Sequence, residues 1–217
     1  MKEKKEIHIN GRVLQYEEKE IILGVKQLNK SKSAENLRIL GEELNKRNVR
    51  YGLMFGTLLG AVRENDFIDH DEDTDVFVLE EDRDIVMQSL FSLEEKGLKV
   101  IRYLPILISL MRDNEYIDLY FFHKTRDLYY RKVRKFGIHH VLPAKFLEEV
   151  SLYGFCGGKY PIPIEKEKVL ETLYGKDWKV PVKNFHAPNN TLRARLRLII
   201  PKKILNIRKS ILKLFNK

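Results

Sequence analysis

The chain has 217 residues, 43% of them hydrophobic, and a formal net charge of +9. This length and apolar content suffice for one folded domain with a sizeable core and short additions. A single cysteine, Cys156, excludes an intrachain disulfide and is typical of a reducing compartment.

The positive charge is concentrated at the C-terminal end. Residues 191–217 contain four arginines, five lysines and no acidic residue, so residues 1–190 are formally neutral. The first six residues are charged rather than apolar, and no run approaches the roughly 18 apolar residues that span a bilayer. We therefore expect a cytoplasmic protein whose contact with a membrane is peripheral.

Residues 1–32 are expected to form an N-terminal extension made of a hairpin and a helix. Residues 6–16 alternate around Asn10-Gly11, a strong signal for a two-residue hairpin turn. A helix is expected over 18–29, and leucines at helical spacing predict another over 33–48 after a Ser33 cap. The hairpin residues expected to be buried are Ile7, Ile9, Val13 and Leu14.

A run of carboxylates leads into an apolar strand in the middle of the chain. Asp71, Asp73 and Asp75 recur at every second position, and in extended backbone such residues share one face, roughly 6.5–7 Å apart. Their mutual repulsion would raise their pKa values, and a hard divalent cation such as Mg2+ relieves it best. On its own, however, this pattern is also typical of a solvated acidic turn.

An expected strand over 49–55 precedes the aspartates and breaks at Gly56 into a short helix. Glycine lets backbone approach a ligand closely, and free N–H groups at a helix start attract phosphate. A phosphate site at Gly56-Thr57, followed by a carboxylate cluster, predicts metal-assisted phosphoryl or nucleotidyl chemistry.

These motifs resemble the signature of the LicD/fukutin-related transferases. The matching residues are Gly-Thr-Leu-Leu-Gly-Ala-Val-Arg from Gly56, then Phe-Ile, then Asp-x-Asp-x-Asp and an apolar strand. Tyr174-Gly175 followed by Trp178 resembles the closing Tyr-Gly-x-x-Trp motif of the family, so the resemblance covers about residues 34–181. It implies an α+β fold, a nucleotidyltransferase-like mixed sheet flanked by helices, as a catalytic domain over 33–181.

The resemblance also implies an activity and a set of site residues. Members pass a phospho-alcohol from a CDP-linked donor to a hydroxyl of a cell-surface glycan or its lipid-linked precursor. The residues implied to hold Mg2+ or Mn2+ are Asp71, Asp73, Asp75 and Asp118. Those implied to hold donor phosphates are Gly56, Thr57 and Arg63. The family usually has Pro-Trp at Asp69-His70 and isoleucine at Thr74, so donor or acceptor preference can differ here.

Several of these assignments have alternatives in the residues themselves. Asp118 stands alone in an apolar strand over 115–122, and without the resemblance it can equally face solvent or pair with an arginine. Arg63 can pair at the surface with Glu64 or Asp66. Four histidines are candidate bases for the acceptor hydroxyl, and spacing singles out none of them: His70, His123, His139 and His140.

The rest of the expected catalytic domain is predicted to consist of two helices joined by short strands and turns. We expect a helix over 82–96 ending at Gly97, strands over 99–103 and 105–111, and a turn at Asp113-Asn114. Short strands and turns follow over 127–162, with a hairpin tip at Gly157-Gly158, and then a helix over 165–174 closed by Gly175. Trp178 is expected to be a packed aromatic rather than a substrate contact.

Residues 182–217 are expected to form a basic amphipathic tail. After Pro201 the apolar residues fall on about half of a helical wheel and the lysines on the other, which favours an anionic membrane surface. The alternative is a helix docked on the protein itself or in a dimer. Nucleic acid is not expected, because the aromatics are not interleaved with the basic residues.

Two other functions are compatible with the motifs. One is nucleotidyl transfer from an NTP with release of pyrophosphate on the same fold. The other is a non-catalytic membrane or nucleic-acid adaptor that uses only the basic tail.

Overall fold

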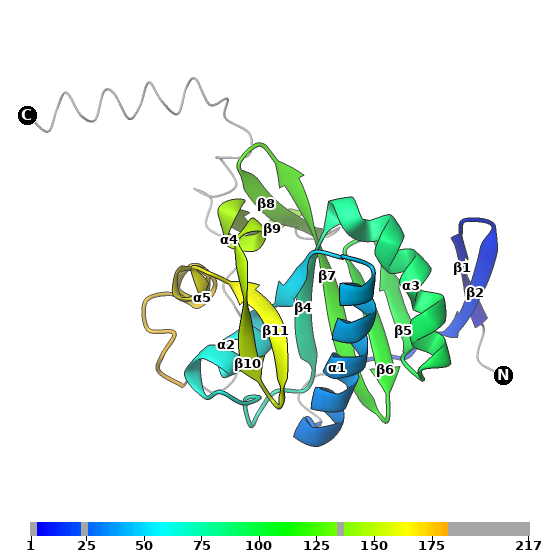
Figure 1. Ribbon diagram of the computed structural model, residues 1–217, viewed down its shortest axis with the longest axis horizontal. Coiled ribbons are helices and arrows are strands. Elements are labelled where there is room, and N and C mark those ends of the chain that lie inside the picture. The colour runs from blue at the N-terminus through cyan, green and yellow to red at the C-terminus, as the bar shows by residue number, and fades with distance from the viewer. Residues whose placement is uncertain (1–3, 23–25, 134–136, 182–217) are drawn as a thin grey trace, which may run out of the picture.

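The computed structural model describes residues 4–22, 26–133 and 137–181, which form a mixed sheet with helices around it (Figure 1). The strand order is β3-β4-β7-β6-β5, and β8 and β9 extend it from β7. Only β4 and β7 run parallel, while the other pairs are antiparallel. The strands are β3 Tyr51–Leu53, β4 Thr74–Leu79, β5 Lys99–Leu104, β6 Leu107–Arg112, β7 Glu115–Thr125, β8 Leu128–Val133 and β9 Gly137–Pro143. The predicted α+β class with a mixed sheet is therefore confirmed.

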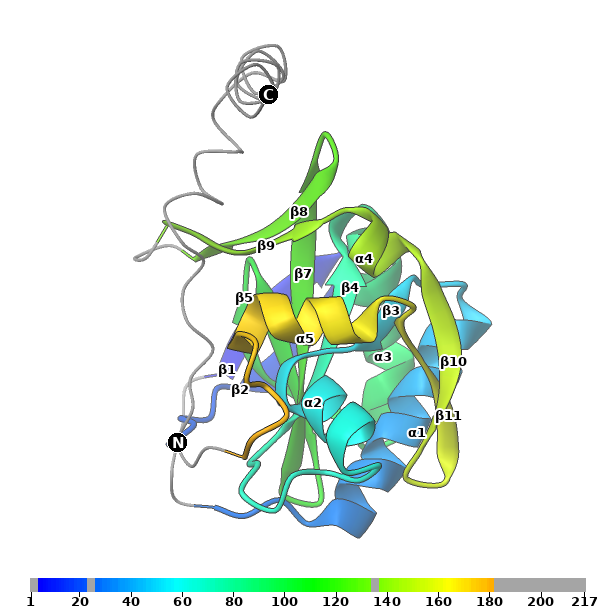
Figure 2. The ribbon, with the colours of Figure 1, turned by 90° about the vertical axis from the view of Figure 1, so that its left-hand side faces the viewer.

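Helices α1 Lys30–Lys46 and α3 Arg83–Glu95 lie side by side over one face of the sheet (Figure 1). A 3-10 turn, η1 Glu80–Asp82, precedes α3. Leu37, Leu40 and Leu44 of α1 are fully buried, as their helical spacing predicted. Helices α2 Phe55–Arg63 and α5 Lys166–Tyr174 pack against each other, and α2 also contacts β4 (Figure 2).

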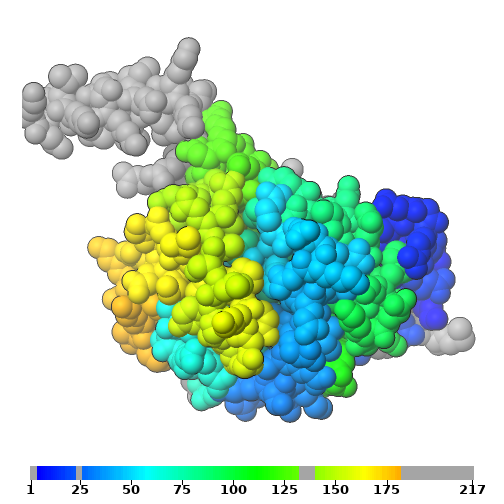
Figure 3. All heavy atoms as spheres, in the orientation of Figure 1, coloured from blue at the N-terminus to red at the C-terminus, as the bar shows by residue number. Residues whose placement is uncertain are grey.

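The N-terminal hairpin is made of β1 Lys4–Ile9 and β2 Arg12–Glu17, and it packs at one end of the body (Figure 3). Asn10 and Gly11 both have positive φ, 47° and 77°, as a type I′ turn requires. Three of the four residues expected to be buried are so, but Val13 is 46% exposed and Tyr16 is buried instead. The register explains this, because Tyr16 pairs with Lys5 on the face of Ile7.

The helix expected over 18–29 is not present among the described residues of that range. The backbone there bonds to other elements instead, with Lys19 N donating to Ile101 O at 2.9 Å and Leu28 N to Asp71 O at 2.9 Å. Helix α1 starts at Lys30, and the side chain of Asn29 caps it by accepting a hydrogen bond from Lys32 N. Ser33, the expected cap, is buried inside the helix.

The C-terminal half follows the predicted order with small shifts. A short helix, α4 Lys145–Glu148, was not predicted, and it leads into the hairpin of β10 Val150–Phe155 and β11 Gly158–Pro163. The tip of that hairpin is Cys156-Gly157, one residue earlier than expected, because these two residues carry the positive φ angles. Trp178 is buried in the core, as expected. The helix expected in the tail lies outside the described residues.

No helix in the described ranges is long and apolar enough to cross a membrane.

Helices α1 and α3 are joined by a buried glutamate. The Glu43 carboxylate accepts hydrogen bonds from Arg47 Nε at 2.6 Å, Lys96 Nζ at 2.8 Å and Ser92 Oγ at 2.9 Å. Burial alone would raise the pKa of Glu43, but these donors outweigh it and lower the pKa to about 2. The contact therefore stabilises the fold when Glu43 is ionised.

Replacing Glu43 by glutamine should lower the free energy of unfolding by about 1–3 kcal/mol at pH 7, because the buried carboxylate loses its charged hydrogen bonds to Arg47 and Lys96, whose own side chains are partly exposed. Since the folded pKa lies below the unfolded value, the contribution is complete above about pH 4.5 and is lost as the pH falls toward 2. In urea unfolding, the difference in the free energy of unfolding between Glu43→Gln and the original protein should become smaller as the pH falls from about 4.5 toward 2. Glu42→Gln is the matched control, since Glu42 is exposed and forms a surface ion pair with Arg38, so this substitution should change the free energy of unfolding by less than about 1 kcal/mol. An equal effect of both substitutions would contradict the assignment.

Candidate active site

The junction between β3 and α2 fixes the position of Asp75 on the neighbouring strand β4. Met54 N donates to Asp75 O at 3.0 Å, and Gly56 N donates to Asp75 Oδ2 at 3.2 Å. In return, Asp75 N donates to Thr57 Oγ1 at 2.8 Å, and Thr57 is fully buried. These contacts give Gly56 and Thr57 a structural role at the site that the sequence did not reveal. Their predicted contact with donor phosphates stays a prediction.

Gly56 is also required by the position of Asp71. A Cβ atom at Gly56 would lie 2.4 Å from Asp71 Oδ2, so a larger residue there would displace the Asp71 carboxylate. Asp71 Oδ2 is buried and has no hydrogen-bond partner among the described residues. The carboxylate of Asp71 is therefore packed against the start of α2, with one oxygen free to bind a cation.

Parallel pairing of β4 with β7 brings Asp75 directly beside Asp118. One carboxylate oxygen from each of Asp73, Asp75 and Asp118 lies within 4.8 Å of the others. The three residues are called the carboxylate triad below. The predicted convergence of Asp118 with the aspartates before it is confirmed.

Asp71 does not join this triad, contrary to the alternation expected from the sequence. Strand β4 begins only at Thr74, so the backbone before it is not extended in the way that would align Asp71 with Asp73 and Asp75. Asp71 still belongs to the same neighbourhood, because its charge raises the pKa values of both Asp73 and Asp75.

The triad is electrostatically unfavourable without a cation. Burial, followed by the charge of Asp118, raises the pKa of Asp73 to about 8. Burial raises the pKa of Asp71 to about 6, and burial together with the neighbouring aspartates holds that of Asp75 well above its usual range. Oxygen ligands at this spacing suit a divalent cation such as Mg2+ or Mn2+, whose charge offsets their repulsion. The triad, with the unpartnered oxygen of Asp71 beside it, can therefore hold a metal ion.

Asp118 also has partners among the protein's own groups. Ser109 Oγ donates to Asp118 Oδ1 at 2.5 Å, while Arg102 Nη2 and Tyr120 Oη donate to Asp118 Oδ2 at 2.8 and 3.1 Å. Asp118 thus faces the other aspartates and also pairs with an arginine. From the sequence alone, these two arrangements were alternatives. The three donors fix the orientation of its carboxylate.

An aromatic wall lies next to the triad. Phe55, the first residue of α2, packs edge-on against Tyr120 and against His140, with ring centroids 4.9 and 4.8 Å apart. Arg131 of β8 lies over the ring of Tyr120, 4.0 Å from its centroid. Neither Arg102 nor Arg131 was among the predicted site residues, because each shares its strand with a lysine and so does not stand out as an isolated charge.

The other predicted residues are placed less centrally. Arg63 Nε donates to Glu64 Oε1 at 3.0 Å, which is the surface pair expected as the alternative to phosphate binding. The contact of Arg63 with donor phosphates stays a prediction. His70 is exposed, and His123 lies 3.8 Å from Glu80 Oε2. Of the four candidate histidines, His140 contacts the aromatic wall, while the side chain of His139 lies outside the described part of the chain.

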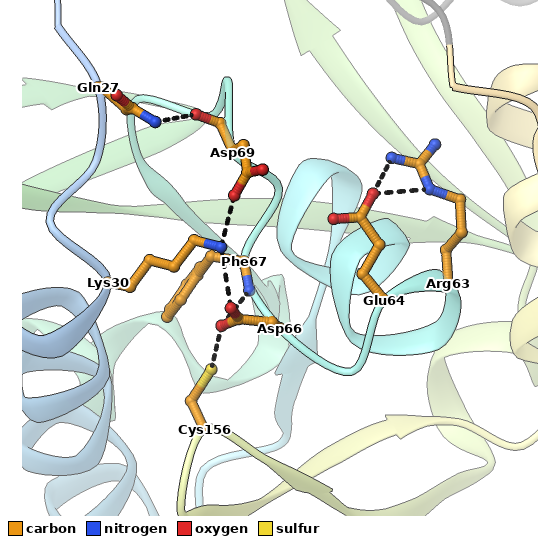
Figure 4. A network of polar contacts seen from close by, with 8 residues as sticks. All are labelled: Gln27, Lys30, Arg63, Glu64, Asp66, Phe67, Asp69 and Cys156. Atoms are coloured by element: carbon orange, nitrogen blue, oxygen red, sulfur yellow. Dashed lines mark hydrogen bonds and ion pairs between the residues drawn. The ribbon is translucent and has the colours of Figure 1, made fainter.

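The loop that carries Asp71 is tied to two other parts of the molecule (Figure 4). Lys30 Nζ donates to Asp66 Oδ2 at 2.8 Å and to Asp69 Oδ1 at 2.7 Å, which joins the loop to the start of α1. Cys156 Sγ donates to Asp66 Oδ1 at 3.3 Å from the tip of the β10–β11 hairpin. Burial and the adjacent Asp66 raise the pKa of Cys156 to about 11, so the thiol stays protonated as a donor.

The raised pKa of Asp73 predicts a pH-dependent stability that a cation removes. Because the folded state binds the proton more tightly, stability without metal should fall as the pH rises from about 4 to 8. In thermal unfolding with EDTA, Asp73→Asn should make the decrease in the free energy of unfolding between pH 4 and pH 8 smaller, by on the order of 2 kcal/mol. Added Mg2+ or Mn2+ should raise the melting temperature of the original protein at pH 8 but not that of Asp73→Asn.

Asp177→Asn serves as the control for this experiment, because Asp177 is exposed and lies outside the triad. It should keep both the pH dependence and the response to the cation. Equal responses to the cation from Asp73→Asn and the original protein would show that the triad is not the metal site.

Comparison with known proteins shows which proteins this chain is similar to. The sequence profile of the LicD/FKTN/FKRP nucleotidyltransferase domain matches residues 48–165, which include Gly56, the aspartates and Asp118. The chain is 27% identical over 161 residues to the ribitol-5-phosphate transferase FKTN of Macaca fascicularis, covering 70% of this chain and 34% of that protein. The FKTN of Homo sapiens matches with the same identity and coverage.

A bacterial relative and two solved structures are more distant. An uncharacterised protein of Rickettsia typhi is 34% identical over 86 residues, which are 40% of this chain and 27% of that protein. ANT(2'')-Ia in complex with adenylyl-2''-tobramycin is 14% identical, with a TM-score of 0.49 over 85% of this chain and 99% of that one. The lincosamide antibiotic adenylyltransferase LnuA with lincomycin bound is 17% identical, with a TM-score of 0.46 over 63% of this chain and 83% of that one.

The chain spans only about a third of the length of the curated relatives that it matches. The profile, however, covers more than half of this chain, including the parts that build the triad. The chain therefore belongs to the LicD/FKTN/FKRP family and contains its nucleotidyltransferase domain.

Proposed function

We propose that this protein is a metal-dependent transferase that moves a phospho-alcohol from a CDP-linked donor to a hydroxyl of a cell-surface glycan or its lipid-linked precursor. The alcohol phosphate is of the phosphocholine, glycerol phosphate or ribitol phosphate type. The observation that carries the proposal is the convergence of Asp73, Asp75 and Asp118 beside Gly56, inside the family's nucleotidyltransferase domain. The name of the FKTN relatives, a ribitol-5-phosphate transferase, supports the substrate class.

In this proposal the carboxylate triad and Asp71 hold Mg2+ or Mn2+ against the donor diphosphate. A bound cation would neutralise charge on the phosphates and on the CMP leaving group. The acceptor hydroxyl oxygen forms a bond to the phosphorus of the transferred group as its bond to CMP breaks, and the hydroxyl proton is released.

The chain's own residues orient the groups for this reaction. The contacts from Gly56 and Thr57 hold Asp75 in place, and those from Arg102 and Ser109 hold Asp118. Fixed carboxylates need little reorganisation when a cation binds, which favours a well-defined position for the donor. Arg63, which lies at the end of α2, is proposed to reach a donor phosphate in exchange for its contact with Glu64.

Asp75→Asn should abolish transfer, with a loss of about a thousandfold or more, because it removes a charged ligand from the centre of the triad. The assay presents CDP-choline, CDP-glycerol and CDP-ribitol with Mg2+ or Mn2+ and a glycan acceptor, and measures release of CMP. Asp84→Asn is the control, since Asp84 is exposed on α3 over the other face of the sheet, and it should retain full activity.

Other products would point to the alternative functions. Release of pyrophosphate from an NTP would establish nucleotidyl transfer in place of phospho-alcohol transfer. An acceptor-modification phenotype that survives Asp75→Asn would reject both enzymatic functions and favour an adaptor.

We also propose that residues 191–217 attach the protein to the inner face of the cell membrane. The support is their composition, with nine basic residues and no acidic one, since each Lys or Arg near an anionic surface contributes about 1 kcal/mol. This attachment would bring the domain close to lipid-linked acceptors.

Truncation after residue 190 should therefore remove binding to anionic liposomes in a co-sedimentation assay. Neutral liposomes are the control, and the full chain should bind them much more weakly because the attraction depends on surface charge. Undiminished binding of the truncated protein to anionic liposomes would reject the role of the tail.

A further inference from the structure

Arg131 of β8 is a buried arginine at the edge of the site, only 8% exposed. Its guanidinium lies 4.0 Å from the ring centroid of Tyr120 and 5.2 Å from that of Phe55. Its Nη1 lies 3.3 Å from His140 Nδ1. Three aromatic groups from α2, β7 and β9 thus surround the planar head of Arg131 and fix its orientation.

The charge of Arg131 has no direct counterion in the described part of the chain. Arg50, Arg83 and Arg102 each form an ion pair with a carboxylate. Arg131 forms no such pair with any residue that the structure describes. Its Nε is buried without a hydrogen-bond partner among those residues. Leaving a charged donor buried and unpaired is costly, so a site that keeps one is suited to bind an anion.

Tyr120 links Arg131 to the triad, because the guanidinium lies over its ring, 4.0 Å from the centroid, and Tyr120 Oη donates to Asp118 Oδ2 at 3.1 Å. Burial lowers the pKa of Arg131, while the nearby carboxylates of Asp75 and Asp118 act in the opposite direction. A guanidinium nevertheless stays protonated in proteins. Arg131 is therefore a fixed positive charge in the field of the proposed metal ligands, and it is separate from Arg102, which is already engaged by Asp118.

We propose that Arg131 binds a phosphoryl oxygen of the donor's diphosphate next to the cation held by the carboxylate triad, an inference that rests on the proposed function. A guanidinium offers planar N–H donors that match phosphate oxygens, and stacking on Tyr120 holds those donors in place before the donor binds. The anion supplies the partner that buried Nε lacks. Arg131 would thus be a substrate-binding residue, whereas Arg102 positions Asp118.

The test measures binding of pyrophosphate in the presence of Mn2+, by calorimetry on the full chain. Arg131→Lys keeps a positive charge but loses the planar fork, and Arg131→Gln loses the charge as well. Both should bind pyrophosphate about ten- to a hundredfold more weakly than the original protein, the loss expected for a charged hydrogen bond. Both should bind Mn2+ alone with unchanged affinity, since the triad is intact.

Arg12→Gln is the matched control. Arg12 also stacks on an aromatic ring, 3.7 Å from the centroid of Phe91, but it lies on the N-terminal hairpin. This variant should bind both Mn2+ and pyrophosphate normally. Pyrophosphate affinity unchanged in Arg131→Lys and Arg131→Gln would overturn the inference, as would failure of the original protein to bind pyrophosphate with Mn2+.

Two further measurements separate this inference from the proposed function. Should the variants not fold, a crystal structure of the original protein with Mn2+ and CDP decides the matter. A guanidinium nitrogen of Arg131 within hydrogen-bond distance of a phosphate oxygen supports the inference, and a nitrogen out of reach of every phosphate oxygen overturns it. Release of CMP in the transfer assay is scored independently, so a protein that turns over CDP-alcohols without needing Arg131 would retain the proposed function and refute the inference.

Discussion

The structure depends on the parallel pairing of β4 with β7, which places two carboxylates side by side in the interior of the sheet. Asp75 and Asp118 are paired residues of these strands, and both are buried. Asp73 adds a third carboxylate where the chain enters β4. Such an arrangement opposes folding, because like charges are brought together where water is scarce. Its persistence in a well-packed sheet is the strongest physical argument that the site binds a cation.

The surrounding elements compensate for this cost by supplying donors at fixed positions. Backbone and hydroxyl groups at the start of α2 bond to Asp75, and a guanidinium and two hydroxyl groups bond to Asp118. The two carboxylates are therefore held by different parts of the chain, α2 for one and the antiparallel strands β5, β6 and β7 for the other. The packing of α2 against β4 is consequently part of the site and not only of the core.

Much of this site could be predicted from the sequence, and the failures have identifiable causes. Asp118 was assigned through the family resemblance, because a lone carboxylate in an apolar strand can equally face solvent or pair with an arginine. Arg102 and Arg131 were missed because each shares its strand with a lysine and so does not stand out as an isolated charge. Asp71 lies beside the triad and not in it, because β4 begins only at Thr74 and the start of a strand cannot be read from alternation alone. Its role as a metal ligand stays a prediction. The helix expected over 18–29 failed because backbone contacts with Ile101 and Asp71, both remote in sequence, replace its internal hydrogen bonds. Contacts between residues so far apart in the chain cannot be predicted from the sequence of the segment itself.

The two arginines near the aspartates explain why a cation and a diphosphate would bind together. When all four aspartates are ionised, which without metal requires a pH above their raised pKa values, the carboxylates outnumber the guanidinium groups of Arg102 and Arg131, and the site repels an anionic donor. A divalent cation brings the formal charge of these groups to zero, and Arg102 remains engaged by Asp118. Arg131 is then the cationic group of this set without a carboxylate partner among the described residues. A divalent cation keeps the aspartates ionised as its ligands and at the same time cancels the repulsion that they would exert on an anionic donor, so the metal and the donor are expected to favour each other's binding.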